Sequence, residues 1–287
     1  MELATPITIH WDFPDGTPDT ALMLRICDDV VQCRPLMLQL TVLDPQAIDG
    51  VVAVLARLQG KGIAVSLTTS PATLELALAT PLQDFGLKEI LLAVEQVADL
   101  KAAASLQGIG VSFSVNKDNW RELPPLITFC REEGIGRLVL PMQRLYRGET
   151  PFHLNRGEQD ELAGSLSRMG GASELNLTIH DPFLWRAFNP GVPFPQCGCQ
   201  AANTMIAIAP DGGVYPCPTL PVKLGEIGEL SLKAIIASPT KKEYRRRLLE
   251  SPADCRDCAE VAVCRGGCRG RAYVNHRTLD GIDIACS

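Results

Sequence analysis

Short apolar runs recur along the first 190 residues at fairly even spacing, and stretches long enough for a helix separate most of them. The runs that predict strands are Ile7–Trp11, Leu36–Leu43, Ile63–Thr68, Glu89–Val94, Ile109–Val115, Arg137–Pro141 and Glu174–Ile179. The clearest helix candidates are Thr20–Cys33, Pro45–Gln59 and Trp120–Glu133, and Gly134 follows the last as a C-terminal cap would. Strands that are apolar on both faces and alternate with helices indicate parallel β/α units.

Two α/β topologies are compatible with this alternation. Six or seven right-handed units predict a complete or partial barrel of the (β/α)6 type, and a doubly wound open sheet is the competing prediction. The segment Asn189–Gln196 holds three prolines and a glycine in eight residues, which is typical of a domain boundary. We therefore expect a barrel over residues 1–190 and a small, loop-rich domain over residues 191–287.

Eight of the eleven cysteines lie in the last 91 residues, at spacings typical of metal sites. They run Cys197-x-Cys199, Gly212-x₄-Cys217, Cys255-x₂-Cys258-x₅-Cys264-x₃-Cys268 and finally Cys286. A small region with few apolar residues needs a crosslink, and bound metal can supply it. Iron–sulfur clusters, structural zinc and disulfides all use such cysteines, and Cys255-x₂-Cys258 alone would serve as half of a zinc site.

The N-terminal sequence and the net charge narrow the choice among these cysteine chemistries and among possible partners. No basic segment followed by an apolar stretch opens the chain, and runs such as Leu36–Leu43 are too short to span a bilayer. We therefore expect a cytoplasmic protein without membrane contact, whose reduced thiols disfavour disulfides. A net charge of −6 and a pI near 5.3 argue against nucleic acid as a partner. Spacing alone then favours iron–sulfur clusters modestly over zinc.

The stretch from Cys199 to Cys286 resembles the SPASM domain, the auxiliary iron–sulfur module of many radical-SAM peptide-modifying enzymes. That family's pattern is a Cys, 9–15 residues, a Gly, four residues and a Cys, followed by C-x₂-C-x₅-C-x₃-C and a last Cys. Twelve residues separate Cys199 from Gly212 here, and every later interval fits. The residues of the segments Ile208–Cys217 and Cys264–Cys268 are also similar to those of the family.

The resemblance implies two [4Fe–4S] clusters with interleaved ligands. Those expected for cluster II are Cys255, Cys258, Cys264 and Cys286, and those for cluster I are Cys197, Cys199, Cys217 and Cys268. Family members usually place the first two cysteines of cluster I further apart. If only one of Cys197 and Cys199 binds, cluster I keeps an open iron or is a smaller cluster.

Residues between the cysteines could tune such clusters. An oxidised Cys₄ cluster carries about two negative charges, which nearby cations would compensate. The candidates are Arg256, Arg265, Arg269 and Arg271, and the alternative is that they are solvated surface residues. Gly266 and Gly267 could bring backbone N–H groups close to sulfur, or could simply form a tight turn.

The resemblance also implies a SAM site that this chain lacks. A radical-SAM barrel carries C-x₃-C-x₂-C after its first strand and Gly-Gly-Glu at the end of its second. Here Asp12–Asp19 contains no cysteine, and Leu40–Pro45 stands in place of the glycine motif. We expect Cys27, Cys33 and Cys130 to be small buried hydrophobes, since no third thiol accompanies the first two. The chain is therefore expected to bind no SAM, and no catalytic residue is assigned.

The remaining motifs carry weaker signals. The four histidines share no spacing, and His180-Asp181 is an ordinary strand-end pair unless it faces a site at a barrel mouth. The basic run Lys241–Arg247 is expected to be a solvated helix face, with docking of an acidic peptide or a partner subunit as the alternative.

These expectations favour an iron–sulfur protein that assists peptide maturation. It would bind a radical-SAM/SPASM enzyme, a precursor peptide or both, and would pass electrons through its clusters; it resembles the SPASM-only component of GeoRSP systems. One alternative is a stand-alone redox or Lewis-acid enzyme that uses an open iron at Cys197 and Cys199. The other is a structural zinc protein.

Overall fold

The computed structural model describes residues 3–79, 82–102, 108–172, 174–194 and 198–286. They form two compact units: unit 1 is Met1–Ala93 with Gln200–Arg245, and unit 2 is Val94–Cys199 with Arg246–Ser287. Each unit combines part of the first 190 residues with part of the tail. The units therefore describe a different division from the expected domain boundary at residue 190, which stays a prediction.

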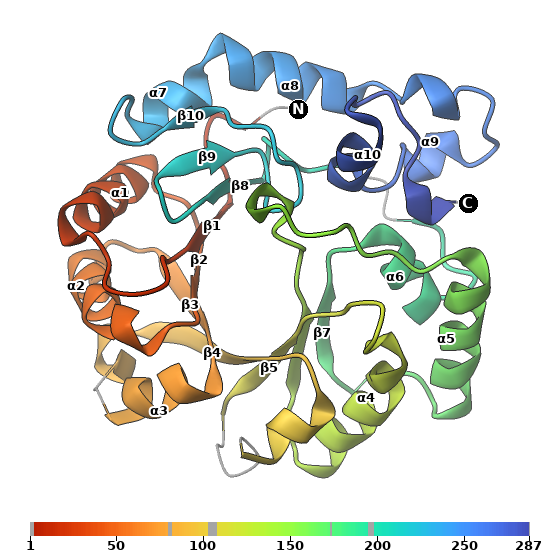
Figure 1. Cartoon of the computed structure of the whole chain (residues 1–287), viewed down its shortest axis with the longest axis horizontal. Helices are drawn as coiled ribbons and strands as arrows, with labels where there is room; N and C mark the ends of the chain where they lie inside the picture. The colour runs from red at the N-terminus through yellow and green to blue at the C-terminus, as the bar shows by residue number, and fades with distance from the viewer. Residues whose placement is uncertain (1–2, 80–81, 103–107, 173, 195–197, 287) are drawn as a thin grey trace. The chain divides into compact units, whose positions relative to one another are not determined.

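Unit 1 is built on a sheet in the order β10–β9–β8–β1–β2–β3–β4 (Figure 1). The strands are β1 (Thr8–Asp12), β2 (Met37–Val42), β3 (Ala64–Thr69), β4 (Leu87–Val94), β8 (Met205–Ile208), β9 (Gly213–Tyr215) and β10 (Gly225–Glu226). β8 pairs parallel with β1, while β9 and β10 add antiparallel strands at the edge. The cysteine-rich tail thus begins by extending the sheet of unit 1.

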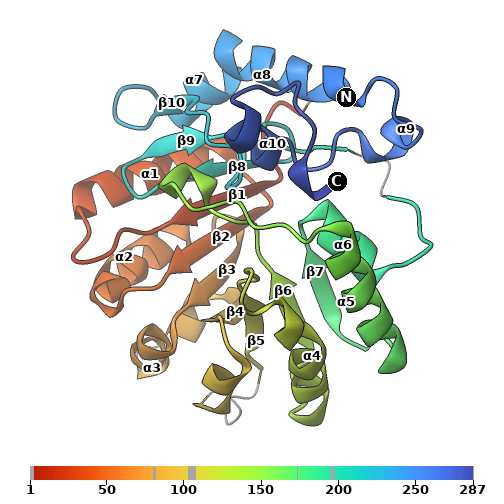
Figure 2. The ribbon, with the colours of Figure 1, turned by 45° about the vertical axis from the view of Figure 1, so that its right-hand side comes forward.

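Helices cover one face of this sheet, as Figures 1 and 2 show. They are α1 (Thr20–Cys33), α2 (Ile48–Leu58) and α3 (Pro71–Ala79), with α7 (Leu232–Ala237) packed beside α1 and α8 (Pro239–Leu249) following it. The carboxylate of Asp19 caps α1, and that of the buried Asp29 accepts the N–H of Leu232 at the start of α7. These two carboxylates fix where the helices begin.

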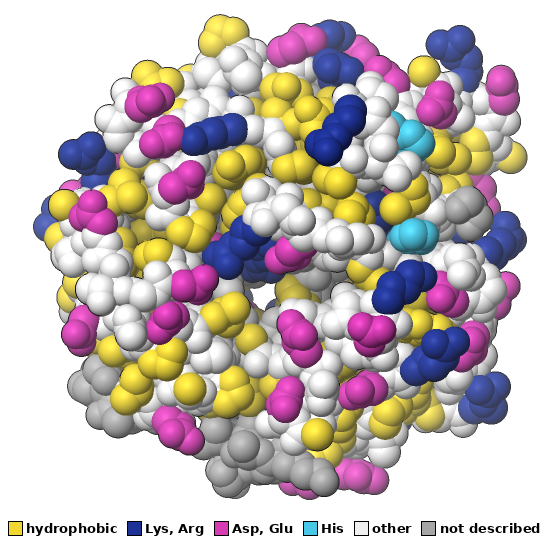
Figure 3. All heavy atoms as spheres, in the orientation of Figure 1, with side chains coloured by type: hydrophobic (Ala, Val, Ile, Leu, Met, Phe, Trp, Pro, Cys, Tyr) yellow, Lys and Arg dark blue, Asp and Glu magenta, His cyan; other side chains and the backbone are white. Residues whose placement is uncertain are grey.

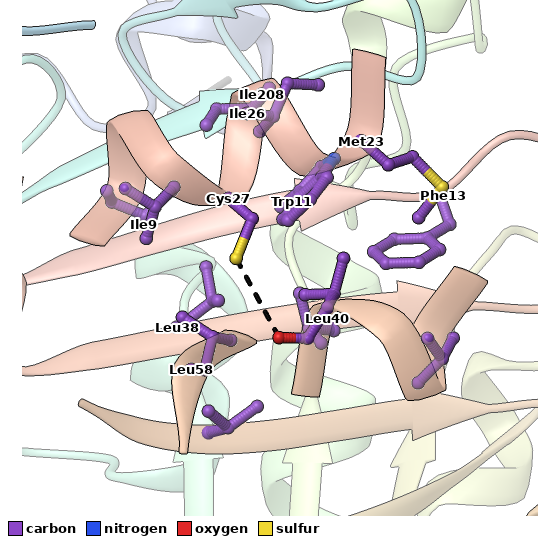
Figure 4. Close-up of a cluster of buried hydrophobic side chains, with 14 of the residues drawn as sticks. Ile9, Trp11, Phe13, Met23, Ile26, Cys27, Leu38, Leu40, Leu58 and Ile208 are labelled. Carbon is purple, nitrogen blue, oxygen red and sulfur yellow. Dashed lines mark hydrogen bonds between the residues drawn. The ribbon is translucent and has the colours of Figure 1, made fainter. Parts of the chain in front are cut away.

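The core of unit 1 lies between the sheet and these helices (Figure 4). Trp11 lies on β1 and Phe13 in the loop directly after it. Their ring centroids are 4.9 Å apart, and both side chains are buried. Cys27 projects from α1 into the same cluster, where its Sγ lies 3.8 Å from the Val54 carbonyl oxygen. Cys27 and Cys33 are therefore core side chains, as predicted.

The opposite face of the sheet is polar, which corrects the expectation of strands apolar on both faces. His10, Gln39, Ser66 and Glu89 stand in register across β1 to β4, and the Ser66 hydroxyl donates to Glu89 at 3.0 Å. A strand alternates its side chains, and the helices α1 to α3 cover only one side. Only that side therefore had to be apolar.

Unit 2 contains a second set of β/α elements and the end of the chain. Its strands β5 (Gly110–Phe113), β6 (Arg137–Leu140) and β7 (Asn176–Ile179) are parallel. Its helices are α4 (Leu123–Glu132), α5 (Arg156–Arg168), α6 (Pro182–Phe188), α9 (Val261–Cys264) and α10 (Arg269–His276). Asn155 and Glu158 form a capping box on α5, and Asp181 caps α6.

The expected fold class is confirmed: every predicted strand overlaps an observed parallel strand. The three predicted helices are also present, although 3₁₀ turns at Pro45–Ala47 and Trp120–Glu122 open the second and third. Strands β8, β9 and β10 were not predicted, because they are short and lie in a segment expected to be loops. Among the residues described, no helix is both long and apolar enough to cross a bilayer.

Removing the thiol of Cys27 tests its place in the core. We expect Cys27→Ala to lower the free energy of unfolding at pH 7 by about 1 kcal/mol, the scale of a small cavity. Burial, and then the charge of Asp28, raises the pKa of Cys27 to about 12. The unfolded chain releases this proton above about pH 8.5, so wild-type stability falls as pH rises towards 12.

The Cys27→Ala penalty should therefore shrink between pH 7 and pH 10 in denaturant unfolding under reducing conditions. An equal penalty at both pH values would contradict this assignment.

Candidate functional site

Four of the tail cysteines in unit 2 line one pocket. Cys255 ends a 3₁₀ turn, Cys264 ends α9, Cys286 ends the last turn of the chain, and Cys258 lies between the first two in an exposed loop. The pocket is completed by Phe183, Glu260, Val261, Gly266, Ile282 and Asp283. The structure therefore brings together the four residues expected for cluster II, although three come from separate turns and one comes from a loop.

The electrostatics of these thiols reflect how closely they gather. Burial raises the pKa of Cys255, and the thiolates of Cys286 and Cys258 raise it further. Burial likewise raises the pKa of Cys286, with Cys258 and Asp283 adding to the effect. Thiolates that repel one another need a shared cation, and the irons of a cluster supply positive charge at that place.

Cys255, Cys258, Cys264 and Cys286 are all free thiols. Within the described ranges of the chain, no three Cys, His, Asp or Glu side chains gather tightly enough to hold a single metal ion. A [4Fe–4S] cluster makes a different demand, because each thiolate binds its own iron and the four sulfurs surround a larger group. Four free thiols around one pocket fit that demand.

Gly266 and Gly267 form a tight turn and also bring backbone N–H groups close to sulfur, the two roles considered from the sequence. Their φ values are +89° and +61°, and their N–H groups lie against the Cys264 sulfur, where they oppose the rise in its pKa that burial causes. A Cβ on Gly266 would lie 2.4 Å from Pro252 Cγ, and one on Gly267 would lie 2.6 Å from Asp283 Oδ2. Only glycine fits this turn, and it leaves backbone donors aimed at the pocket.

A buried ion pair holds the pocket's walls in place. Arg271, on α10, donates to both carboxylate oxygens of Asp283, Nε to Oδ1 at 2.6 Å and Nη2 to Oδ2 at 2.8 Å. It also pairs with Asp181, the cap of α6, and donates to the Phe152 carbonyl at 3.1 Å. Burial works to lower the pKa of Arg271, but the two carboxylates outweigh it and raise the pKa well above its usual range.

Asp283 in turn fixes the backbone at two cysteines. It accepts the N–H of Cys268 at 2.6 Å and that of Ala285, beside Cys286, at 3.1 Å. No local sequence pattern links Asp283 with Arg271, because twelve positions separate them. Arg271 was predicted only as a possible charge partner for a cluster, and Asp283 was not predicted.

The residues expected for cluster I are distributed differently. Cys199 and Cys268 belong to unit 2, whereas Cys217 is a buried residue of unit 1. Cys197 lies outside the described residues. Cluster I, including the question of an open iron at Cys197 and Cys199, therefore stays a prediction from the sequence pattern.

The four arginines considered from the sequence fall into two classes. Arg256 and Arg265 are exposed, and the Arg265 side chain lies along Gly198, where a Cβ would be 2.8 Å from its Cδ. Arg269 and Arg271 are 1% and 2% exposed, which separates them from ordinary surface arginines. Two of the four thus meet the burial that a charge partner of a cluster requires.

The loop after β1, which holds no cysteine over Asp12–Asp19, is tied to the loop after β2. Phe13 is buried in the core, and the Asp44 carboxylate accepts the N–H groups of Gly16 at 2.7 Å and Gln46 at 2.8 Å. Asp44, which follows β2, thereby ties this loop to the next β/α connection. Cys33, at the end of α1, is buried, and burial raises the pKa of its thiol to about 11.

The weaker motifs have structural explanations. Burial, with the nearby Arg144 and Arg137, lowers the pKa of His180 to about 4, while Asp181 caps α6 and pairs with Arg271. In the basic run of α8, Lys241 and Arg245 are buried in unit 1, and Arg245 donates to the Ala201 carbonyl. The expectation of a fully solvated face was therefore wrong.

On the face in Figure 3, both signs of charge are mixed.

Two sequence comparisons identify relatives of this chain. The SPASM family, described as an iron–sulfur cluster-binding domain, matches residues 197–259. The PqqA peptide cyclase of Granulibacter bethesdensis is 22% identical over 92% of this chain and 77% of that protein. A cysteine-type anaerobic sulfatase-maturating enzyme of Clostridium perfringens is 28% identical over 26% of this chain and 21% of that protein.

Solved structures share the fold at low identity. Streptococcus suis SuiB bound to its precursor peptide SuiA superposes with a TM-score of 0.66 at 15% identity, covering 98% of this chain and 76% of SuiB. The anSMEcpe protein with bound AdoMet gives 0.66 at 14% identity, covering 98% and 91% of the two chains. The fold is thus shared with SuiB and anSMEcpe, and residues 197–259 match the SPASM iron–sulfur cluster-binding domain.

Proposed function

We propose that this protein is an iron–sulfur partner in a radical-SAM peptide-maturation system and performs no SAM chemistry itself. It would bind an active radical-SAM/SPASM enzyme, a precursor peptide or both, and would exchange electrons through two [4Fe–4S] clusters. The observation that carries the proposal is the meeting of four free thiols at one pocket, in a chain whose β1–α1 loop holds no cysteine.

The residues of the pocket suit a bound cluster. Cys255, Cys258, Cys264 and Cys286 would hold it, and a bound [4Fe–4S] cluster supplies reversible one-electron transfer. Phe183 packs against Cys264 and Cys286 with Phe194 and Ala285, which excludes water from that side. Exposed Cys258 leaves the other side open to solvent. Electrons would therefore enter or leave on the Cys258 side, where a redox partner can approach.

The absence of SAM chemistry rests on unit 1. The segment where a radical-SAM enzyme carries three cysteines is Asp12–Asp19 here, and the nearest thiols, Cys27 and Cys33, are buried behind β1 in the helix-facing core. Burial holds the pKa of both thiols at about 11 or above, so neither is a ready thiolate. SuiB, which shares the fold, is described as bound to S-adenosylmethionine, so the missing cysteines support a different role for this chain.

The peptide part of the proposal rests on the relatives. SuiB is described as bound to a precursor peptide, and the relative from Granulibacter bethesdensis as a cyclase of the PqqA peptide. A chain that keeps their fold but lacks the cysteines for SAM would keep peptide or enzyme recognition without the chemical step.

Loss of one exposed ligand tests the assignment of cluster II. Protein purified without oxygen should contain about eight irons and eight sulfides per chain, the content of two [4Fe–4S] clusters. Because Cys258 is exposed, Cys258→Ala disturbs little packing, and we expect its iron content to fall to about four. Cys130→Ala, which removes a buried thiol of the same unit, is the matched control and should keep the wild-type content.

Iron and sulfide analysis with electron paramagnetic resonance (EPR) of the reduced protein measures both variants. Full iron content in Cys258→Ala would contradict this ligand assignment, and zinc in place of iron in the wild type would support the structural zinc alternative.

A stable partner is the second consequence of the proposal. Tagged protein isolated from its native host should bring with it, in comparable amount, a chain that carries C-x₃-C-x₂-C after its first barrel strand. Mass spectrometry of the purified complex identifies that motif directly. A protein that remains alone, with both clusters present, would leave the iron–sulfur assignment intact and overturn the partner role.

A further inference from the structure

Gln159 is a buried amide on α5 whose hydrogen-bonding partners come from three different parts of unit 2. The side chain is 4% exposed. Its Nε2 donates to the Leu154 carbonyl at 2.8 Å and to the Ala285 carbonyl at 3.0 Å. Its Oε1 accepts from Nη2 of Arg186, on α6, at 3.2 Å. A glutamine amide has two N–H donors and one acceptor oxygen, so both donors and the acceptor are engaged here.

The partner most distant in sequence belongs to the turn that carries Cys286. In that turn, Ile284–Cys286, the buried residue is Ala285, which packs against Phe183 beside α6 (Figure 2). A single methyl group buries little apolar surface, so the turn depends on its polar contacts. The N–H of Ala285 donates to Asp283 Oδ1 at 3.1 Å, and its carbonyl accepts from the amide. Side chains therefore hold both backbone groups of the residue before Cys286.

Arg186 fixes the orientation of the amide and links it to a second cysteine. Its guanidinium lies over the Phe183 ring, 4.9 Å from the centroid, and pairs with Glu260 at 3.3 Å. Because a guanidinium only donates, the amide turns its oxygen towards Arg186 and its NH₂ group towards the two carbonyls. The carbonyl of Glu260 accepts the N–H of Cys264 at 2.8 Å. A chain of polar contacts thus runs from the segment of Cys264 to the turn of Cys286.

We propose that Gln159 is a positioning residue for cluster II: its amide holds the turn that carries Cys286 at the pocket. This inference rests on the proposed function, because it assigns Cys286 to a bound cluster. Without the amide donor, the buried Ala285 carbonyl loses its partner, which is unfavourable, and the turn moves to recover one. The other expected ligands lie in separate segments, which are those of Cys255, Cys258 and Cys264.

Gln159→Glu is the sharpest change, because glutamate has the same size and keeps an oxygen for Arg186 but loses the N–H donors to the two carbonyls. Gln96→Glu is the matched control, since it makes the same substitution at an exposed position of the same unit. Cys130, which is buried in unit 2, reports whether the unit as a whole has loosened.

The full-length protein, purified without oxygen, is incubated with a ferrous-iron chelator and iodoacetamide together. Absorbance follows the released iron, and mass spectrometry follows alkylation at each cysteine. In Gln159→Glu we expect the irons of cluster II, about four of eight, to leave faster than in the wild type. Alkylation of Cys286 should be about tenfold faster, the scale of one lost buried hydrogen bond. Cys130 should stay protected, and Gln96→Glu should match the wild type.

The two readouts separate the failure of this inference from the failure of the proposed function. Wild-type alkylation of Cys286 in Gln159→Glu, or an equal acceleration at Cys130, would overturn the positioning role. Faster loss of all the iron would overturn it as well. A wild type without iron would instead refute the proposed function, while the rate at Cys286 would still show whether the amide holds its turn.

Gln159→Glu could fail to fold, because its carboxylate faces two buried carbonyls. Arg186→Met then decides the matter, since it removes the guanidinium that orients the amide and keeps an apolar side chain over Phe183. We expect a smaller acceleration at Cys286 in this variant, again with Cys130 protected. An unchanged rate at Cys286 would overturn the proposed chain of contacts.

Discussion

The buried pair of Arg271 and Asp283 is the interaction on which the candidate site depends. Asp283 binds two nitrogens of Arg271 and two backbone N–H groups, one at Cys268 and one beside Cys286. Removing one partner of such a pair usually costs about 3–5 kcal/mol, because the other charge stays buried. The thiols gather at one pocket because this carboxylate joins the turn at Cys268 to the last turn of the chain.

Several features of unit 2 follow from that pair. Gly267 must be glycine because a Cβ would collide with Asp283, and the same turn aims N–H groups at Cys264. Asp181 caps α6 and binds Arg271, so the helix that carries Phe183 to the pocket is held by the same cation. A single polar network thus places the ligands, the backbone donors and the apolar wall of one site.

The sequence predicted the parallel β/α pattern well, because strands such as Leu36–Leu43 carry long apolar runs and Gly134 ends its helix clearly. It missed β8 to β10, since strands this short derive their stability from pairing with β1 and with each other. The polar row at His10 and Gln39 was missed because only the structure shows which face the helices cover. The pairing of Arg271 with Asp283 depends on tertiary contact, which no local spacing encodes.

We propose that the clusters of the tail are the chemistry of this protein and that it binds no SAM. The replaced β1–α1 loop, tied down by Asp44, and the buried Cys27 and Cys33 support it together. EPR of the anaerobically reduced protein with and without added SAM tests it most directly. We expect the two spectra to be identical, and a SAM-dependent change in the cluster signals would contradict the account.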